Sequence, residues 1–211
     1  MAIKALIWDF AGVLLHTVEG DFNSLLSSRL GVPISEIERV FSTQENNLWD
    51  LGEMEDEAFF AFVTDELHLP EEKRITLARH FVDDFYVQPA LLDYIRDIRK
   101  KYTTVLLTNF PRHLHTYLKT DWFIEGAFDY LIASCDVKLI KPDPRMYQYT
   151  LDKIGCSNDE VVFIDDRPMN LEGAEKLGIR SLLYRDTPQI IADLEKIFST
   201  DVVEIQSANR L

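Results

Sequence analysis

The sequence predicts an α/β fold, in which a parallel sheet carries helices on both faces and a small helical insert follows the first strand. From residue 88 onward, short apolar runs of strand length alternate with segments of helical periodicity. Between His16 and Phe85, no segment has the pattern of a strand. Alternation at these lengths favours a parallel sheet with right-handed crossovers. The 211 residues, 46% of them hydrophobic, are enough to bury a substantial core as one large or two modest domains.

The first expected strand, residues 3–8, ends at Asp9, and a later apolar run, residues 161–164, ends at Asp165 and Asp166. A continuous apolar run of this length is typical of a buried parallel strand, which delivers the residue after it to the carboxyl edge of the sheet. Ligands of open α/β sheets bind at that edge. Three carboxylates gathered there would repel one another without a cation between them, and their hard oxygen atoms suit Mg²⁺. The sequence therefore predicts a magnesium site.

The insert is assigned to residues 16–85 and is expected to be helical throughout. Its second helix is expected to begin at Ser35, an N-cap residue three positions before Glu38. The insert contains sixteen acidic residues against five Lys and Arg, within a net charge of −14 for the chain. Nucleic acid binding needs cationic side chains, so we expect a solvated acidic surface that repels large polyanions. The expected helices are Phe22–Leu30, Ile34–Val40, Met54–Val63 and Ile75–Phe85.

After the insert, residues 86–200 are expected to form the core of the fold together with residues 1–15. Residues 201–211 form a tail that is either a short extra strand or disordered. The elements expected in the core are the helices Leu91–Lys100, His113–Leu118, Met146–Ile154 and Leu171–Leu177 and the strands Val105–Leu107, Tyr130–Ala133, Val161–Ile164 and Ser181–Tyr184.

Two further strand ends supply polar groups other than acids. The run at residues 103–107 stops at Thr108 and Asn109, where free backbone N–H groups can hold an anion. Downstream, Lys141 precedes Pro142, which favours an extended backbone at the lysine. An acid, a hydroxyl, a lysine and paired acids, in this order, are the groups needed for phosphoryl transfer through an aspartyl-phosphate.

Taken together, these four motifs resemble those of the haloacid dehalogenase superfamily of phosphohydrolases, and they span nearly the whole chain. The segments WDFAGVL at Trp8–Leu14 and FIDDRPMNLEGA at Phe163–Ala174 are similar to a particular subgroup. That subgroup contains the N-terminal phosphatase domain of soluble epoxide hydrolase and bacterial sugar-phosphate phosphatases. The resemblance implies a Rossmann-like catalytic core, a cap domain formed by the insert, Mg²⁺ as cofactor and hydrolysis of a small phosphorylated metabolite.

The resemblance also implies roles for individual residues. Asp9 corresponds to the nucleophile that attacks phosphorus, and the backbone carbonyl of Ala11 corresponds to a metal ligand. Gly12 permits the tight backbone turn that follows. The hydroxyl of Thr108 and the backbone N–H of Asn109 are expected to bind the phosphate of the substrate.

The remaining motif residues surround the nucleophile. Lys141 is expected to pair with both Asp9 and the transferring phosphoryl group. Asp166 resembles the direct metal ligand, and Asp165 the acid behind it. Asn170, four residues beyond Asp166, is expected to orient the Asp166 carboxylate from the start of a helix.

One position departs from the family pattern. Phosphatases of the family usually carry a second aspartate two residues after the nucleophile, which protonates the leaving alcohol and then activates water, whereas this chain has Ala11. General acid–base assistance contributes about 10²–10⁴-fold to the rate, so we expect slower chemistry or a substitute group. His16, beside the expected hinge of the insert, is the histidine placed where it could substitute.

Three alternative functions follow from the same motifs. Alanine at this position is also similar to phosphonoacetaldehyde hydrolases, which need a cap lysine for a Schiff base, and Lys73 is the single lysine of the insert. True haloacid dehalogenases work without metal, and the acid pair Asp165-Asp166 argues against them. A binding or regulatory module that keeps the pocket without turnover is the third alternative.

Side chains of the insert are expected to divide between its own core and the pocket. Phe59, Phe60 and Phe62 are predicted in the core, whereas Trp49 and the turn at residues 51–53 are predicted to face the pocket.

Other sequence features predict the setting of the protein. No apolar run approaches the roughly 20 residues of a membrane helix, and the N-terminus reads as a strand rather than a signal peptide, so we expect a cytoplasmic location. Cys135 and Cys156 have no metal-type spacing and are expected to be reduced. His113 and His115 lie two apart on an expected helix and are not expected to share a metal. The oligomeric state is left open.

Overall fold

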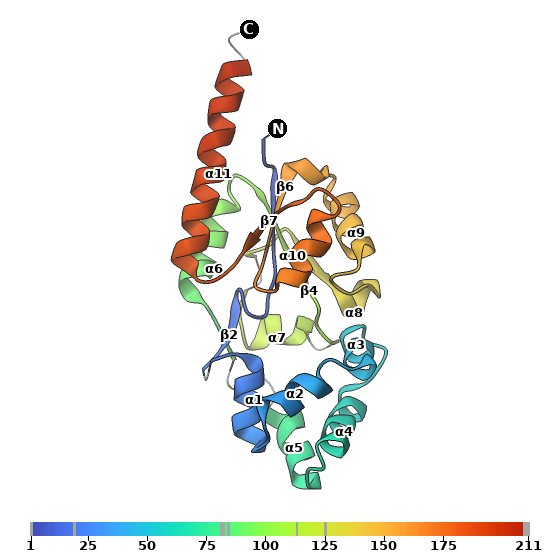
Figure 1. Cartoon of the computed structure of the whole chain (residues 1–211). Helices are drawn as coiled ribbons and strands as arrows, with labels where there is room; N and C mark the ends of the chain where they lie inside the picture. The colour runs from blue at the N-terminus through green and yellow to red at the C-terminus, as the bar shows by residue number, and fades with distance from the viewer. Residues whose placement is uncertain are drawn as a thin grey trace.

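The computed structural model describes residues 2–18, 20–80, 83, 85–112, 114–124 and 126–208. At its centre lies a five-stranded sheet in the order β5-β4-β1-β6-β7, and every pair of neighbours is parallel, as predicted. β1 is the middle strand, so the residues that follow β4, β1 and β6 lie side by side at one edge (Figure 1). The strands are β1 Ala5–Trp8, β4 Thr103–Thr108, β5 Tyr130–Ala133, β6 Val161–Asp165 and β7 Arg180–Leu183.

Hydrophobic side chains cover both faces of the sheet, which explains why its strands are apolar without alternation. Leu6 and Trp8 of β1 belong to one core cluster, and Ala5 and Ile7 belong to the other, because successive side chains point to opposite faces. The first cluster is closed by α6 Pro89–Ile98, α7 Leu114–Thr120 and α11 Thr187–Ala208, and the second by α9 Pro144–Ile154 and α10 Pro168–Glu175. Two short helices, α8 Ser134–Val137 and η1 Asn158–Glu160, follow β5 and precede β6.

The insert forms a helical layer with its own hydrophobic core beyond the carboxyl edge of the sheet (Figure 1). Phe59 and Phe60 are buried in that core, and Phe62 packs against it, as predicted. Trp49 is also buried there and stacks on Phe59 with 4.1 Å between ring centroids, so the expectation that it faces the pocket is wrong. The helices are α1 Phe22–Leu30, α2 Ile34–Val40, α3 Gln44–Asp50, α4 Asp56–Glu66 and α5 Glu71–His80.

Both junctions of the insert are strands, contrary to the expectation of a strand-free segment from His16 to Phe85. β2 Leu15–Thr17 and β3 Phe85–Val87 pair antiparallel, with His16 opposite Tyr86. A three-residue strand is too short to show the alternation from which strands are recognised.

Two smaller expectations about element ends are also wrong. Pro33, not Ser35, is the N-cap of α2, and its φ of −59° already suits the start of a helix. Residues 201–208 continue α11 instead of forming a strand or a disordered tail, and residues 209–211 lie outside the described residues.

Of the two histidines considered as a metal pair, His113 lies outside the described residues, while His115 contacts Asp136 at 2.8 Å. In the described part of the chain, every helix is too short or too polar to cross a membrane.

Candidate active site

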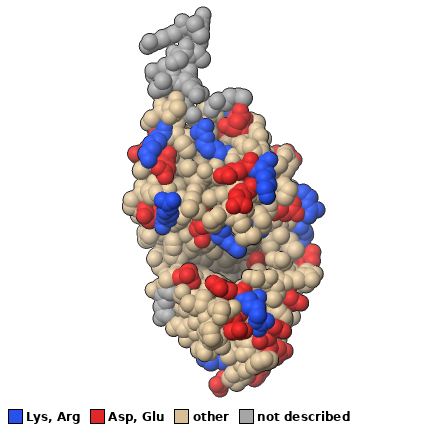
Figure 2. Space-filling model, viewed as in Figure 1, with Lys and Arg blue, Asp and Glu red and all other residues tan. Residues whose placement is uncertain are grey.

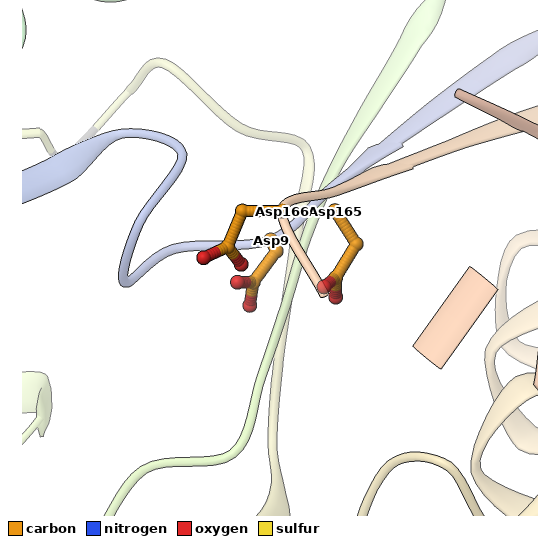
Figure 3. Close-up of side chains that lie close together, drawn as sticks. All are labelled: Asp9, Asp165 and Asp166. Carbon is orange, nitrogen blue, oxygen red and sulfur yellow. The ribbon is translucent and has the colours of Figure 1, made fainter. Parts of the chain in front are cut away.

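The strand ends bring three carboxylates together at the carboxyl edge of the sheet. β1 pairs with β6 so that Trp8 lies beside Ile164, and the backbone N–H of Asp9 donates to the Ile164 carbonyl at 2.9 Å. Asp9, Asp165 and Asp166 each offer an oxygen atom, and these atoms lie within 4.8 Å of one another. In Figure 3, the Asp166 carboxylate lies on one side of Asp9 and the Asp165 carboxylate on the other.

Lys141 bridges two of these acids. Its Nζ donates to Asp9 Oδ1 at 2.6 Å and to Asp165 Oδ2 at 2.8 Å. All three side chains are buried, so water screens these charges little. Burial lowers the pKa of Lys141, but the charges and hydrogen bonds of Asp9 and Asp165 outweigh this effect and raise it above its usual value. The lysine is therefore a fixed cation beside the nucleophile expected from the sequence.

Asn109 and Thr108 lie at the end of β4, next to this lysine. The Asn109 side chain forms two hydrogen bonds with the Lys141 backbone, donating to its carbonyl at 3.0 Å and accepting from its N–H at 2.8 Å. This clamp gives the Asn109 side chain a positioning role that the sequence did not reveal. Thr108 is buried at the last position of β4, where it pairs with Ala133 of β5.

Asp165 has a complete set of partners in addition to the lysine. Asn170 Nδ2 donates to both of its carboxylate oxygens at 3.0 Å, and the Arg167 backbone N–H donates to Oδ1 at 2.8 Å. The expectation that Asn170 orients Asp166 is therefore wrong. Asn170 lies on the first turn of α10, and the amide faces back toward the end of β6, where Asp165 is the buried acid.

Asp166 differs from Asp165 because its Oδ1 atom is buried without a hydrogen-bond partner. Burial and the Asp165 charge raise the pKa of Asp166 to about 6. Gly12, at φ +94°, makes room for this carboxylate, since a Cβ there would lie 2.3 Å from Asp166 Oδ2. Burial also raises the pKa of Asp9 above its usual value, despite the opposing effect of Lys141.

This arrangement fits a divalent cation. Lys141 supplies one positive charge to three carboxylates, and the unpartnered oxygen of Asp166 lies in the same cluster as Asp9. A buried polar atom without a partner is costly unless a ligand or ion satisfies it. Carboxylate oxygens are the ligands that Mg²⁺ prefers.

Two residues discussed for acid–base chemistry also have defined places. Ala11 is exposed in the turn between β1 and β2. The His16 Nε2 atom lies 2.9 Å from the Val13 carbonyl, and the His16 ring lies near those of Tyr86 and Tyr184, with centroids 6.0 and 6.1 Å away. Its ring nitrogen is therefore engaged with the backbone of the turn between β1 and β2.

The turn at residues 51–53, which follows Asp50, contacts the core, because Arg112 Nε donates to the Gly52 carbonyl at 2.8 Å. The surface is hollowed where the insert meets the core (Figure 2). Ser134, the residue after β5, donates from Oγ to the Asp50 carbonyl at 2.5 Å. The sequence could have indicated Ser134, which follows an apolar strand as Thr108 ends one. It had no signal to single out Asp50 among sixteen acids of the insert.

Comparison with known sequences identifies the family. The sequence profile of haloacid dehalogenase-like hydrolases matches residues 3–178, a range that includes the acids, the lysine and the strand ends described above. The chain belongs to this family. Rat (Rattus norvegicus) bifunctional epoxide hydrolase 2 is 43% identical over 112 residues, which are 50% of this chain and 20% of that protein. The sesquiterpene phosphatase astK of Aspergillus oryzae is 21% identical over 195 residues, or 92% of this chain and 96% of that protein.

Solved structures have the same fold. A haloacid dehalogenase family enzyme of Bacteroides thetaiotaomicron, in complex with magnesium and inorganic phosphate, has a TM-score of 0.71 and 22% identity, covering 87% of this chain and 95% of that one. A predicted family hydrolase of Porphyromonas gingivalis has a TM-score of 0.72 and 22% identity, covering 92% and 98%. The match to rat epoxide hydrolase spans about one fifth of that protein.

Proposed function

We propose that this hydrolase is a Mg²⁺-dependent phosphatase of small phosphomonoesters that works through an aspartyl-phosphate on Asp9. The observation that carries the proposal is the buried Lys141 bridge between Asp9 and Asp165, beside an Asp166 oxygen without a partner. Asp9, the Ala11 carbonyl and Asp166 would hold the metal, with Asp165 behind them. When bound, Mg²⁺ supplies positive charge that offsets the repulsion between the carboxylates and the phosphate.

The residues of the chain account for the attack on phosphorus. Lys141 holds one Asp9 oxygen, which leaves the other free to form the bond to phosphorus as the bond to the leaving oxygen breaks. Lys141 also stabilises the negative charge of the transferring group, and Asp165 and Asn109 keep the lysine in place. The Thr108 hydroxyl and the Asn109 backbone N–H would bind the phosphate oxygens.

The acidic insert supports a small substrate. The hollow lies between the insert and the core, and acidic side chains are numerous on the insert face seen in Figure 2. A large polyanion would be repelled from that face, whereas a small monophosphate would reach Lys141. The names of two relatives agree with phosphate chemistry, namely a sesquiterpene phosphatase and a flavin mononucleotide hydrolase.

The structure favours the phosphatase over the alternatives. Lys73, the candidate Schiff-base lysine of a phosphonoacetaldehyde hydrolase, donates from Nζ to the Arg29 carbonyl at 2.9 Å, so it is engaged with the backbone of α1. A dehalogenase that works without metal would leave the buried Asp166 Oδ1 atom without a partner. A binding module without turnover would not need the buried bridge between Lys141 and Asp9.

The proposal is tested by a hydrolysis screen over p-nitrophenyl phosphate and small phosphomonoesters with Mg²⁺. We expect turnover that EDTA abolishes and that Asp9→Asn lowers by at least about 10³-fold, because the nucleophile is lost. The matched control is Asp65→Asn, an exposed acid of the insert, which should keep full activity. Phosphate release by Asp9→Asn at the wild-type rate would refute the proposal.

A further inference from the structure

We propose that Asp50, at the end of α3, supplies the acid–base function that Ala11 lacks. This inference rests on the proposed phosphatase function. It assigns to a residue of the insert the proton transfers that the turn after β1 has no side chain to perform, since Ala11 carries a methyl group there.

Asp50 is held at the edge of the sheet by a contact between insert and core. Ser134 Oγ donates to the Asp50 carbonyl at 2.5 Å and accepts from the Phe110 backbone N–H at 2.9 Å. Ala133, the residue before Ser134, pairs with Thr108 in the register of β4 and β5. The Asp50 carbonyl is thus held by the residue that directly follows β5. β5 is the strand that lies beside Thr108, the threonine expected to bind phosphate.

The Asp50 side chain is half-buried, and Asn46 Nδ2 donates to its Oδ2 at 3.4 Å. Burial nonetheless raises the pKa of Asp50 to about 7, against the lowering effects of Arg167, Asn46 and Lys141. An acid that is partly protonated near neutral pH is suited to donate a proton in one step and accept one in the next.

Four other titratable groups considered for this role already have partners. Asp9 and Asp165 bind Lys141, and the raised pKa of Tyr147, caused by burial, leaves its hydroxyl a donor to the Asn170 carbonyl. The His16 ring nitrogen is engaged with Val13 at the hinge.

The proton transfers balance over the two steps. In the first, the bond from Asp9 to phosphorus forms, the bond from phosphorus to the leaving oxygen breaks, and the proton of Asp50 passes to that oxygen to give the alcohol. In the second, the Asp50 carboxylate takes a proton from water, whose oxygen bonds to phosphorus as the bond to Asp9 breaks. Inorganic phosphate leaves, and both aspartates return to their starting states.

The test compares aryl phosphates of similar size but different leaving-group basicity, from p-nitrophenyl phosphate to p-methoxyphenyl phosphate, with Mg²⁺ present. For Asp50→Asn, we expect kcat/KM to fall by about 10²-fold or more for the poor leaving group and by less than about tenfold for p-nitrophenyl phosphate. A burst of p-nitrophenolate followed by a slow steady state should also appear, because water is no longer activated. Asp50→Glu should restore part of the activity toward the poor leaving group.

Two controls make the result specific. Asp65→Asn changes an exposed acid of the insert in the same way and should leave the leaving-group dependence unchanged. His16→Gln tests the rival donor at the hinge. An equal fall for both substrates in Asp50→Asn, no fall for either, or a leaving-group-dependent fall in His16→Gln would overturn the proposal for Asp50. Loss of the phosphatase function itself looks different, because wild-type protein would then release no phosphate from any substrate.

Discussion

Two adjacent acids at the end of β6 have opposite environments, and this difference supports the separate roles proposed for them. Asp165 accepts hydrogen bonds from Lys141, Asn170 and the Arg167 backbone, whereas Asp166 Oδ1 is buried without a partner. Asp165 therefore holds Lys141 in place, while Asp166 has an oxygen available to a ligand. The backbone of Gly12 is the wall of the space around Asp166, because it has no side chain to fill that space.

We predict that Gly12→Ala weakens Mg²⁺ binding by at least about tenfold, because the new Cβ would lie 2.3 Å from Asp166 Oδ2 and must displace that carboxylate. Gly155→Ala is the matched control. Gly155 also has a positive φ, of +68°, but a Cβ there would meet nothing within 4 Å. Both variants should lose about 1–3 kcal/mol of stability from backbone strain, measured by denaturant unfolding.

Only Gly12→Ala should lose Mg²⁺ affinity, measured by calorimetry. Equal Mg²⁺ binding by the two variants would show that Asp166 is not held in the space that Gly12 leaves open.

At the scale of elements, one turn between α3 and α4 attaches the insert to the core. Arg112 donates from Nε to the Gly52 carbonyl at 2.8 Å and from Nη1 to Glu55 at 2.9 Å. Lys138 contacts the Leu51 and Gly52 carbonyls from the end of α8. The same turn begins at Asp50, whose carbonyl accepts from Ser134, so the contacts that join the insert to the core also hold the backbone of Asp50.

We predict that Arg112→Ala raises KM for p-nitrophenyl phosphate by about three- to tenfold with little change in thermal stability, because it removes two hydrogen bonds that join the turn of the insert to the core. Amide hydrogen exchange across residues 50–55 should become faster. Arg39→Ala is the control, because Arg39 binds Glu36 and Glu66 within the insert. A similar rise in KM for Arg39→Ala, or unchanged exchange in Arg112→Ala, would contradict the assigned role.

These elements also show which features the sequence could predict. β1 and β6 were evident because buried parallel strands are apolar throughout, and the acids that follow them are local to the pattern. β2 and β3 were missed because three residues carry no period. The contact between Ser134 and Asp50 joins residues 84 positions apart, so no local pattern contains it. Asn170 was placed on the correct helix start but assigned to the wrong acid, because the direction of a side chain depends on tertiary packing.

At the scale of the whole molecule, the cluster of carboxylates lowers the stability of the folded chain when no metal is bound. The chain carries a net charge of −14, and three of its acids are gathered beside a single buried lysine. Burial raises the pKa of Asp166 to about 6 and that of Asp9 above its usual value, so ionising either acid is easier in the unfolded chain. Sites of this kind place function ahead of stability.

We predict that the metal-free protein loses stability as the pH rises and that Mg²⁺ reverses the loss. The folded-state pKa of Asp166 is raised, so its contribution is full below the ordinary value of 3.8 and is lost as the pH rises through about 6. This change is worth about 3 kcal/mol, with further contributions of the same sign from Asp9 and Asp50, whose pKa values are also raised by burial. In thermal melts with EDTA, Tm should fall by roughly 6–12 °C between about pH 4 and pH 7.5. Millimolar Mg²⁺ should recover much of this loss at the upper pH, because it binds the ionised carboxylates.

Asp166→Asn isolates the source of that pH dependence. Without an ionisable group at residue 166, the EDTA curve should flatten by the share that Asp166 contributes, and the gain from Mg²⁺ should largely disappear. Asp143→Asn changes an acid outside the cluster, whose pKa is lowered by hydrogen bonding to Arg145, and should preserve the Mg²⁺ gain. If wild-type Tm with EDTA instead rose steadily over this range, the carboxylates would be ionised and stably paired without a metal. The unpartnered oxygen of Asp166 would then need a different ligand.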